Sequence, residues 1–312
     1  MSSTAALNTP VVFIIFNRPD VTAKTFREIA RARPRTLLVI QDGPRRSRPG
    51  EADLCAAARR VVSAVDWECD VRTLFSDRNS GPREQLASGL DWAFAQVEEA
   101  IIFEHDCLPD PSFFPFCAEL LERYRDDPRV MSISGNCFVD AADRPAESYY
   151  FSHLPSIWGW ATWRRAWQSY DRTMAGWPQF RRSAEFARIL PLRSTRRHYR
   201  HELDQTFAGR LDTWDYQWTF ATWRRQGLSA LPTRNLVRNI GFGPDATNTR
   251  YHDPALEPPL ESIEFPLRHP PSPPAVRFDA HRRWLDQRYR LLPVISRRCM
   301  QLLQSVRQRL FA

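Results

Sequence analysis

Two carboxylates and an imidazole directly follow an apolar run near residue 100. The run AIIF (100–103) is followed by Glu104, His105 and Asp106. Charged side chains at the end of a buried strand need partners, so this triplet is either a solvated turn or a site for a metal ion or a proton. Carboxylates bind Mg²⁺ and Mn²⁺, and imidazole binds transition metals. The acidic triplet is therefore the first candidate for a functional site.

Apolar runs alternate with amphipathic segments through the first 135 residues and must position this triplet. They predict strands at 10–16, 36–43, 71–75, 100–104 and 130–135, with helices at 20–33, 51–65, 83–97 and 111–125. This alternation indicates a largely parallel sheet covered by helices on both faces. Ligands of such sheets bind beyond the carboxyl ends of the strands. We therefore expect Asn17-Arg18, Asp42-Gly43 and the acidic triplet to converge on one crevice.

The pattern changes after residue 149. The stretch YYFSHLPSIWGWATWRRAWQSYD (149–171) is rich in aromatic residues and has little regular period. Indole faces cover the apolar faces of sugar rings, but Trp158 and Trp160 are equally well explained as core residues. An arginine-rich, helical stretch is expected at 176–211, a helix around 211–227 and a strand-like segment at 228–239. A proline-rich extended strap (254–274) and a basic, partly amphipathic tail follow.

Composition limits the classes of protein. The chain has 312 residues, a formal charge of +8 and a pI near 9.5, and Lys24 is its one lysine. The arginine excess fits an anionic partner such as a phosphate-bearing ligand, a nucleic acid or a membrane surface, although a GC-rich genome would produce the same bias. Six cysteines without a CxxC pair predict neither a zinc site nor a disulfide framework. Because we find no signal peptide and no apolar run long enough to span a membrane, we expect a cytoplasmic protein.

Neither GxGxxG nor GxxxxGK[ST] occurs in the chain, which argues against a dinucleotide-binding domain and a P-loop enzyme. The ordered motifs over residues 10–250 instead resemble the GT-A fold glycosyltransferases, or nucleotide-diphospho-sugar transferases. They are most similar to the inverting N-acetylglucosaminyltransferase I type and its bacterial relatives. The resemblance implies an α/β, Rossmann-like fold with a mostly parallel sheet. It divides the chain into a domain at 1–253, with a nucleotide-sugar half (10–135) and an acceptor half (149–253), and a strap with a helical tail at 254–312.

Three motifs of the first half carry the nucleotide-binding part of this resemblance. VVFIIFNRP (11–19) implies that Asn17 and Arg18 line the nucleotide pocket. VIQDG (39–43) implies that Asp42 hydrogen-bonds the uracil edge, although an Asp-Gly pair is also common in turns. NSGPREQLASGLDWAF (79–94) implies that Arg83 approaches the diphosphate.

The acidic triplet lies in IIFEHDCLPDPSFF (101–114), which resembles the metal-binding strand end of the family. Asp106 is implied to be the metal ligand, with Glu104 and His105 contacting the nucleotide sugar. His105 stands where those relatives carry aspartate. Mn²⁺ and Mg²⁺ both suit carboxylate and phosphate oxygens, and a nearby imidazole favours Mn²⁺.

The second half carries the acceptor-side motifs. SIWGWATW (156–163) resembles the acceptor loop, so Trp158, Gly159 and Trp160 are implied to contact the acceptor. WDYQW (214–218) resembles a Trp-Asp-Asp-Trp segment, which makes Asp215 the catalytic base and Trp214 an acceptor contact; a helix N-cap is the alternative for Asp215. NIGFG (239–243) resembles the loop that closes over the donor. Its implied donor contacts are Asn239, Gly241 and Gly243.

The implied activity is metal-dependent, inverting transfer of a sugar from a nucleoside-diphosphate donor, a UDP-sugar, to a hydroxyl of a glycan or glycolipid, as in bacterial surface polysaccharide synthesis. A metal-dependent nucleotidyltransferase would share the α/β half and the acidic strand end, but it usually carries a glycine-rich loop with a lysine after its first strand. A third alternative is an arginine-rich binding protein for anionic membrane or nucleic acid. Acids at the strand ends argue against nucleic acid, whereas the tail (281–312) is a candidate for attachment to the inner face of a membrane.

Overall fold

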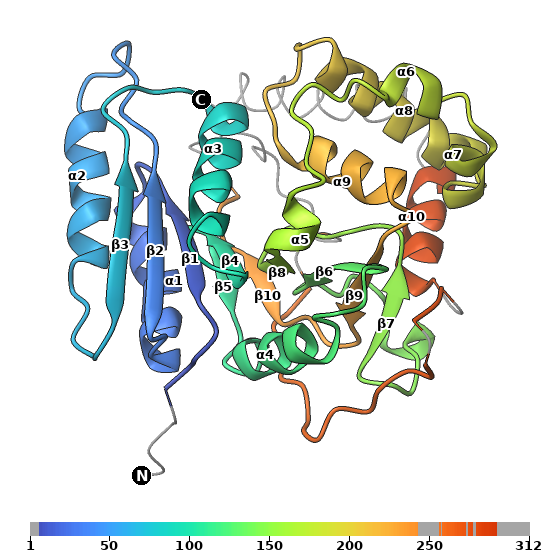
Figure 1. Ribbon diagram of the computed structural model, residues 1–312, viewed down its shortest axis with the longest axis horizontal. Coiled ribbons are helices and arrows are strands. Elements are labelled where there is room, and N and C mark those ends of the chain that lie inside the picture. Colours follow the sequence, from blue (N-terminus) through green and yellow to red (C-terminus); the bar gives the residue numbers. More distant parts are fainter. Residues whose placement is uncertain (1–5, 243–255, 257, 273, 277–278, 292–312) are drawn as a thin grey trace, which may run out of the picture.

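An eight-stranded sheet runs through the middle of the molecule (Figure 1). The computed structural model describes residues 6–242, 256, 258–272, 274–276 and 279–291. In spatial order the strands are β3 (Asp70–Phe75), β2 (Thr36–Gln41), β1 (Val11–Ile15), β4 (Glu99–Glu104), β8 (Trp160–Trp163), β6 (Val130–Ser134), β9 (Leu228–Pro232) and β7 (Tyr149–Ser152). β7 and β8 run antiparallel to their neighbours, and the other six strands point the same way.

Helices cover both faces of this sheet. One core contains residues of α1 (Pro19–Ala32), α2 (Glu51–Val62) and α4 (Phe113–Arg123), and the other contains residues of α3 (Pro82–Phe94), α5 (Arg164–Trp167) and α9 (Asp215–Arg224). Along β1, Phe13 packs in the first core and Ile14 in the second, and both are buried. Strands buried on both faces read as unbroken apolar runs, which is why the sequence reveals them. The predicted α/β class with a mostly parallel central sheet is confirmed.

The aromatic stretch without regular period contains two strands that the sequence analysis leaves as irregular structure. β8 lies between β4 and β6 and is antiparallel to both. Its Trp160 packs in the same core as α9, and Trp163 packs in the same core as α4. All four residues of β8 are buried, so no apolar–polar alternation marks the strand. β7 is equally short and equally buried, and it is missed for the same reason.

A layer of helices lies outside α9 (Figure 1). α6 (Trp177–Phe180), α7 (Ala184–Ile189), α8 (Arg193–Phe207) and α10 (Ala280–Leu291) share a third core that includes Trp177, Leu203 and Leu285. The Thr195 hydroxyl of α8 donates to the Asp286 carboxylate of α10 at 2.6 Å.

Part of the predicted membrane-binding tail is therefore packed on protein. Residues 281–291 belong to α10, whose Leu285 is buried in the third core. Residues 292–312 lie outside the described residues. No helix in the part of the chain that the structure describes is both long and apolar enough to cross a bilayer.

A short ribbon and an extended segment complete the described chain. β10 (Val237–Asn239) pairs antiparallel with β5 (Cys107–Pro109), which starts directly after the acidic triplet. Residues 258–272, within the predicted strap, contain no helix or strand. Glu261 in this segment forms an ion pair with Arg144 at 2.8 Å, next to the short 3₁₀ turn η1 (Ala141–Asp143). The pairing of β5 with β10 brings the loop after β10 over the carboxyl end of β4.

Candidate active site

A cleft of about 400 Å³ lies beyond the carboxyl ends of β1 and β4. Ile14 pairs with Glu104 in the sheet, so the chain that leaves β1 passes beside the acidic triplet. The strand side of the cleft is lined by Phe16, Asn17, Arg18, Glu104, His105 and Asp106. Facing residues come from the loop before β8, from α8 and from the start of α9: Ile157, Trp158, Glu202, Leu211, Thr213, Trp214, Asp215 and Tyr216. Asn239 and Gly241 of the loop after β10 also line it.

The Asp106 carboxylate lies against the backbone of Gly241. A Cβ atom added at residue 241 would stand 1.9 Å from one Asp106 oxygen, so only glycine fits there. The Ile240 amide donates to the Asp106 carbonyl at 2.8 Å, and the Asn239 side chain accepts from the Gly241 amide at 2.7 Å. Arg18 donates to the Gly241 carbonyl at 2.8 Å. Gly243, the third predicted residue of this loop, lies outside the described residues.

Asn17 is tied to the helix that follows β2. Its amide donates to Glu51 at 2.8 Å, and the buried Glu51 carboxylate also pairs with Arg45. This contact fixes the turn after β1, which carries Arg18 into the cleft.

Negative charge is concentrated around Glu104. Burial, together with the nearby Asp106 and Asp215 carboxylates, raises the pKa of the Glu104 carboxyl to about 8, against the opposing effect of a hydrogen bond from Trp214. A substantial share of Glu104 is therefore protonated at neutral pH and can donate a hydrogen bond. Burial also lowers the pKa of His105, which favours a neutral imidazole.

The fit of a divalent cation depends on a ligand's oxygens as well as on the protein. No three His, Cys, Asp or Glu side chains within the described ranges are grouped to hold a metal ion by themselves. Besides burial, the Asp106 and Asp215 carboxylates nevertheless lie close enough to Glu104 to raise its pKa. Mg²⁺-type sites commonly use one or two carboxylates together with phosphate oxygens of the substrate. The side chains present fit a cation shared with a phosphate ligand, and they do not fit a cage made by the protein alone.

Asp215 is the first residue of α9 and faces the triplet across the cleft. The Thr213 hydroxyl donates to its carboxylate, and the backbone amides of Asp215 and Tyr216 also hydrogen-bond it. These bonds lower the pKa of Asp215, but burial outweighs them and raises it. The predicted alternative, a helix N-cap, does not apply to Asp215, because Trp214 occupies that position.

A narrower slot of about 140 Å³ shares the strand-side residues of the cleft and extends toward β2. Asp42 lines it together with Ile15, Arg45 and Asn79. The Asp42 carboxylate accepts from Asn79 at 2.9 Å and from the backbone amides of residues 43, 80 and 81. Direct pairing of Asp42 with a uracil edge needs correction, because these bonds already engage both carboxylate oxygens. Asp42 instead fixes the turn that carries Asn79.

Arg83 does not reach the cleft, contrary to its predicted contact with the diphosphate. Its guanidinium donates to the carbonyl of Arg172 at 2.7 Å and to that of Thr206 at 3.5 Å. The preceding residue, Pro82, lines both the cleft and the slot. Arg83 sits one residue further into α3 and holds the loop after α5 and the end of α8.

The predicted acceptor tryptophans have different environments. Trp158 lines the cleft and is partly exposed, with its ring edge against Phe138 and Phe242. Trp160 is 1% exposed and packs on Trp214 and Trp218, so its assignment as an acceptor contact is wrong. Trp214 lines the cleft although it is almost fully buried, and it hydrogen-bonds Glu104.

Gly159 acts through the backbone. It has a φ of +65° and leaves no room for a Cβ atom, which would lie 2.6 Å from the Val237 side chain. This close approach seats β10 against the turn that enters β8.

Sequence reasoning missed Glu202, Thr213 and Tyr216 as cleft residues. Thr213 directly precedes WDYQW and Tyr216 lies within it, so that motif could have pointed to both. Glu202 lies on α8, in the stretch that the sequence marks as arginine-rich. Nothing in the sequence distinguishes this one acid as a cleft residue.

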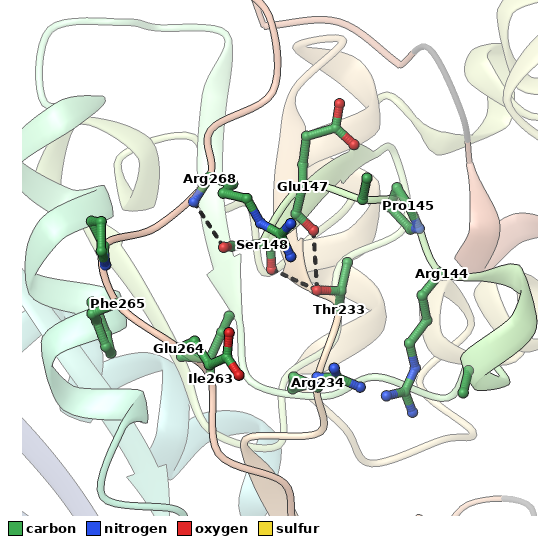
Figure 2. Close-up of a pocket in the computed structure, with 13 residues that line it drawn as sticks. Arg144, Pro145, Glu147, Ser148, Thr233, Arg234, Ile263, Glu264, Phe265 and Arg268 are labelled. Carbon is green, nitrogen blue, oxygen red and sulfur yellow. Dashed lines mark hydrogen bonds between the residues drawn. The ribbon is translucent and has the colours of Figure 1, made fainter.

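A cavity of about 490 Å³ lies elsewhere in the described chain (Figure 2). It is formed between η1, the ends of β7 and β9, and the 263–268 segment. Arg144 and Arg234, which line it, are both paired with Glu261, and Ser148 binds Thr233 and Arg268 through backbone and side-chain hydrogen bonds. Its charged groups largely neutralise one another, whereas the smaller cleft gathers acids at strand and helix ends. We therefore take the cleft, and not this cavity, as the candidate active site.

Comparison with known proteins gives likeness at the level of the fold. No family model matches the sequence, and no curated protein matches it either. The solved structures that match include a cytidylyltransferase from Leptospira borgpetersenii (10% identity, TM-score 0.33), S. aureus TarS (9%, 0.41) and GalNAc-T7 with UDP, GalNAc and Mn²⁺ (10%, 0.42). The matches cover 53%, 72% and 73% of this chain, and 64%, 58% and 43% of those chains.

Proposed function

We propose that the protein is a glycosyltransferase that moves a sugar from a nucleoside-diphosphate donor, a UDP-sugar, to a hydroxyl of a glycan or glycolipid. The observation that carries the proposal is the distribution of acids over two facing walls of one cleft. Asp106 lies beside Arg18 at the strand ends, and Asp215 lies opposite them at the start of α9. The wall at the strand ends is suited to bind phosphate, and the wall at the start of α9 is suited to remove a proton.

The strand wall is the donor side of this proposal. A uracil and its ribose occupy the slot beside Asn79 and Ile15, and the diphosphate lies at Arg18, whose guanidinium can form charge-assisted hydrogen bonds to it. Asp106 would hold a divalent cation, Mn²⁺ or Mg²⁺, together with the diphosphate oxygens, and that cation supplies charge neutralisation as the leaving group departs.

Other residues at the strand ends orient the donor sugar. Glu104, kept partly protonated, donates to a hydroxyl of the sugar or the ribose, while the neutral His105 contacts the same ligand. Asn239 and Gly241 close the donor end of the cleft.

The helix wall is the acceptor side. Trp158 offers its partly exposed indole to the apolar face of an acceptor sugar. Asp215 accepts the proton of the attacking hydroxyl, and its raised pKa makes it a stronger base than an exposed aspartate. A base on the side of the sugar away from the leaving group produces inversion at the anomeric carbon. Surface polysaccharide synthesis in a bacterial cytoplasm is the setting that such a donor and acceptor fit.

Calorimetric titration with UDP, GDP, CDP and ADP, with and without Mn²⁺, tests the donor side. We expect one nucleoside diphosphate to bind more tightly with Mn²⁺, and Asp106→Asn to remove the effect of the metal. No nucleotide binding in any metal would contradict the proposal. Release of pyrophosphate from a nucleoside triphosphate, instead of a diphosphate from a nucleotide sugar, would assign a nucleotidyltransferase.

A further inference from the structure

Positive charge is concentrated in one tenth of the chain. Residues 181–210 contain eight arginines and three acids, which accounts for +5 of the net charge of +8. A compositional preference for arginine over lysine would spread over the whole sequence. A local excess instead points to a surface with its own anionic partner.

The exposed side of α8 carries much of this charge. Thr195, Leu203 and Thr206 are buried, and Arg193, Arg197 and Arg200 lie on the opposite side at helical spacing, where they are exposed. Arg182, between α6 and α7, is also exposed. We call Arg182, Arg193, Arg197 and Arg200 the basic face.

Most of the basic face has no compensating acid. Arg181 and Asp204 form an ion pair at 2.9 Å, and Arg200 donates to the Arg181 carbonyl at 3.2 Å. Within the described residues, the side chains of Arg182, Arg193 and Arg197 make no ion pair or hydrogen bond. Exposed guanidinium groups without local partners remain available for an external anion.

An exposed aromatic residue ends the same helix. Phe207 is 42% exposed at the last position of α8, two turns or less from Arg200. Arginines with a neighbouring exposed apolar ring match an anionic lipid surface, where the cations meet headgroups and the ring enters the interface. A single exposed ring makes no row of stacking platforms, which binding of single-stranded nucleic acid would favour.

α8 also supplies Glu202 to the cleft, from the side of the helix opposite to the basic face. Figure 1 shows α8 with α6 and α7 in the layer outside α9. We propose that this face docks the protein on an anionic membrane surface, with Phe207 as the apolar contact. Docking there attaches the protein to the membrane surface independently of residues 292–312.

Vesicle flotation tests the docking. The full chain is mixed with vesicles of phosphatidylcholine, either pure or with about 30% phosphatidylglycerol, at about 0.1 M salt. We expect binding to the anionic vesicles alone. The triple variant Arg182→Gln, Arg193→Gln, Arg197→Gln should bind them on the order of a hundredfold more weakly. Phe207→Ser should lower the fraction that stays bound at high salt.

A matched control removes three exposed arginines from the other end of the molecule. Arg46→Gln, Arg48→Gln, Arg60→Gln changes the net charge equally and should keep vesicle binding within about twofold. Circular dichroism and thermal unfolding verify that each variant is folded. Equal loss in both triple variants, wild-type binding in the first, or absence of vesicle binding by the wild type would overturn the proposal. Binding of a short RNA that only the first triple variant loses, without vesicle binding, would assign a nucleic acid instead. Because vesicle flotation requires neither a donor nor an acceptor, it tests the docking proposal independently of the proposed sugar transfer.

Discussion

The two walls of the cleft are built in different ways. Strand ends form the donor wall, where sheet register sets the position of each side chain, as in the pairing of Ile14 with Glu104. The acceptor wall consists of a loop and helix ends that rest on buried indoles, with Trp214 stacked on Trp160 at 5.6 Å between centroids. Backbone hydrogen bonds between neighbouring strands therefore fix the donor wall, whereas side-chain packing between distant segments fixes the acceptor wall.

The sharpest test of this division replaces one carboxylate on each wall by an amide. Asp215→Asn should lower kcat by roughly 10² to 10⁴-fold and leave the affinity for UDP unchanged, because the base acts on the acceptor alone. Asp106→Asn should weaken UDP binding in Mn²⁺. Steady-state kinetics and calorimetry separate the two effects, with the exposed Asp66→Asn as a neutral control. A fully active Asp215→Asn variant would remove the acceptor wall from the chemistry.

Packing of the acceptor wall is tested by two tryptophans. Trp160→Ala should lower the free energy of unfolding by about 3 to 5 kcal/mol, because a fully buried indole leaves a cavity. Trp158→Ala, at the cleft surface, should cost less than half as much and mainly raise the KM for the acceptor. Urea unfolding measures the first effect and kinetics the second. Equal destabilisation by both variants would show that Trp158 is a core residue as well.

A third prediction concerns the stability of the fold at acidic pH, outside the two walls of the cleft. His281 of α10 is buried, its Nδ1 atom has no hydrogen-bond partner among the described residues, and burial lowers its pKa to about 4. Folding therefore favours neutral histidine, so the stability it contributes is full above about pH 6.5 and is lost as the pH falls through 4. The loss should not exceed about 3 kcal/mol.

Unfolding in guanidinium between pH 4 and pH 7 measures this effect. His281→Phe keeps an aromatic ring beside Trp284 and should flatten the pH dependence, and His201→Phe on the exposed side of α8 should not. An unchanged slope in His281→Phe would assign the acid sensitivity to other groups.

The smallest expected effect concerns two glycines. Gly241→Ala should displace the Asp106 carboxylate and lower activity about tenfold, since a Cβ atom has no room there. Gly50→Ala, with a φ of +79° and open space around it, should cost about 1 kcal/mol of stability and leave activity unchanged. Activity and thermal unfolding of both variants provide the comparison. Normal activity in Gly241→Ala would mean that the loop after β10 is not fixed against the donor wall.

The sequence predicts the donor half well because its signals are local. Apolar runs such as 10–16 and 36–43 mark buried parallel strands, and polar residues directly after them mark the crevice. Prediction fails where a side chain is engaged by distant backbone. Arg83 has the right chemistry for a phosphate, but carbonyls 89 and 123 residues away in the sequence take its guanidinium.

The acceptor half shows why the rest cannot be predicted in this way. β8 has no alternation because both of its faces are buried, and Glu202 enters the cleft only because α8 packs beside α9. Whether an indole in SIWGWATW faces a ligand or a core depends on which strand lies next to it. That information lies in the tertiary structure and leaves no period in the sequence.

The position of β8 also constrains the order in which the chain can mature during synthesis. β4 and β6 are complete by residue 134, and β4 can already pair with β1, but its other edge has no partner until residues 160–163 have emerged and inserted between β4 and β6. A nascent chain that ends before this point presents β4 as an open edge, the kind of surface that pairs with other chains. The short strand WATW thus covers the exposed edge of β4 and ends this aggregation-prone stage of synthesis.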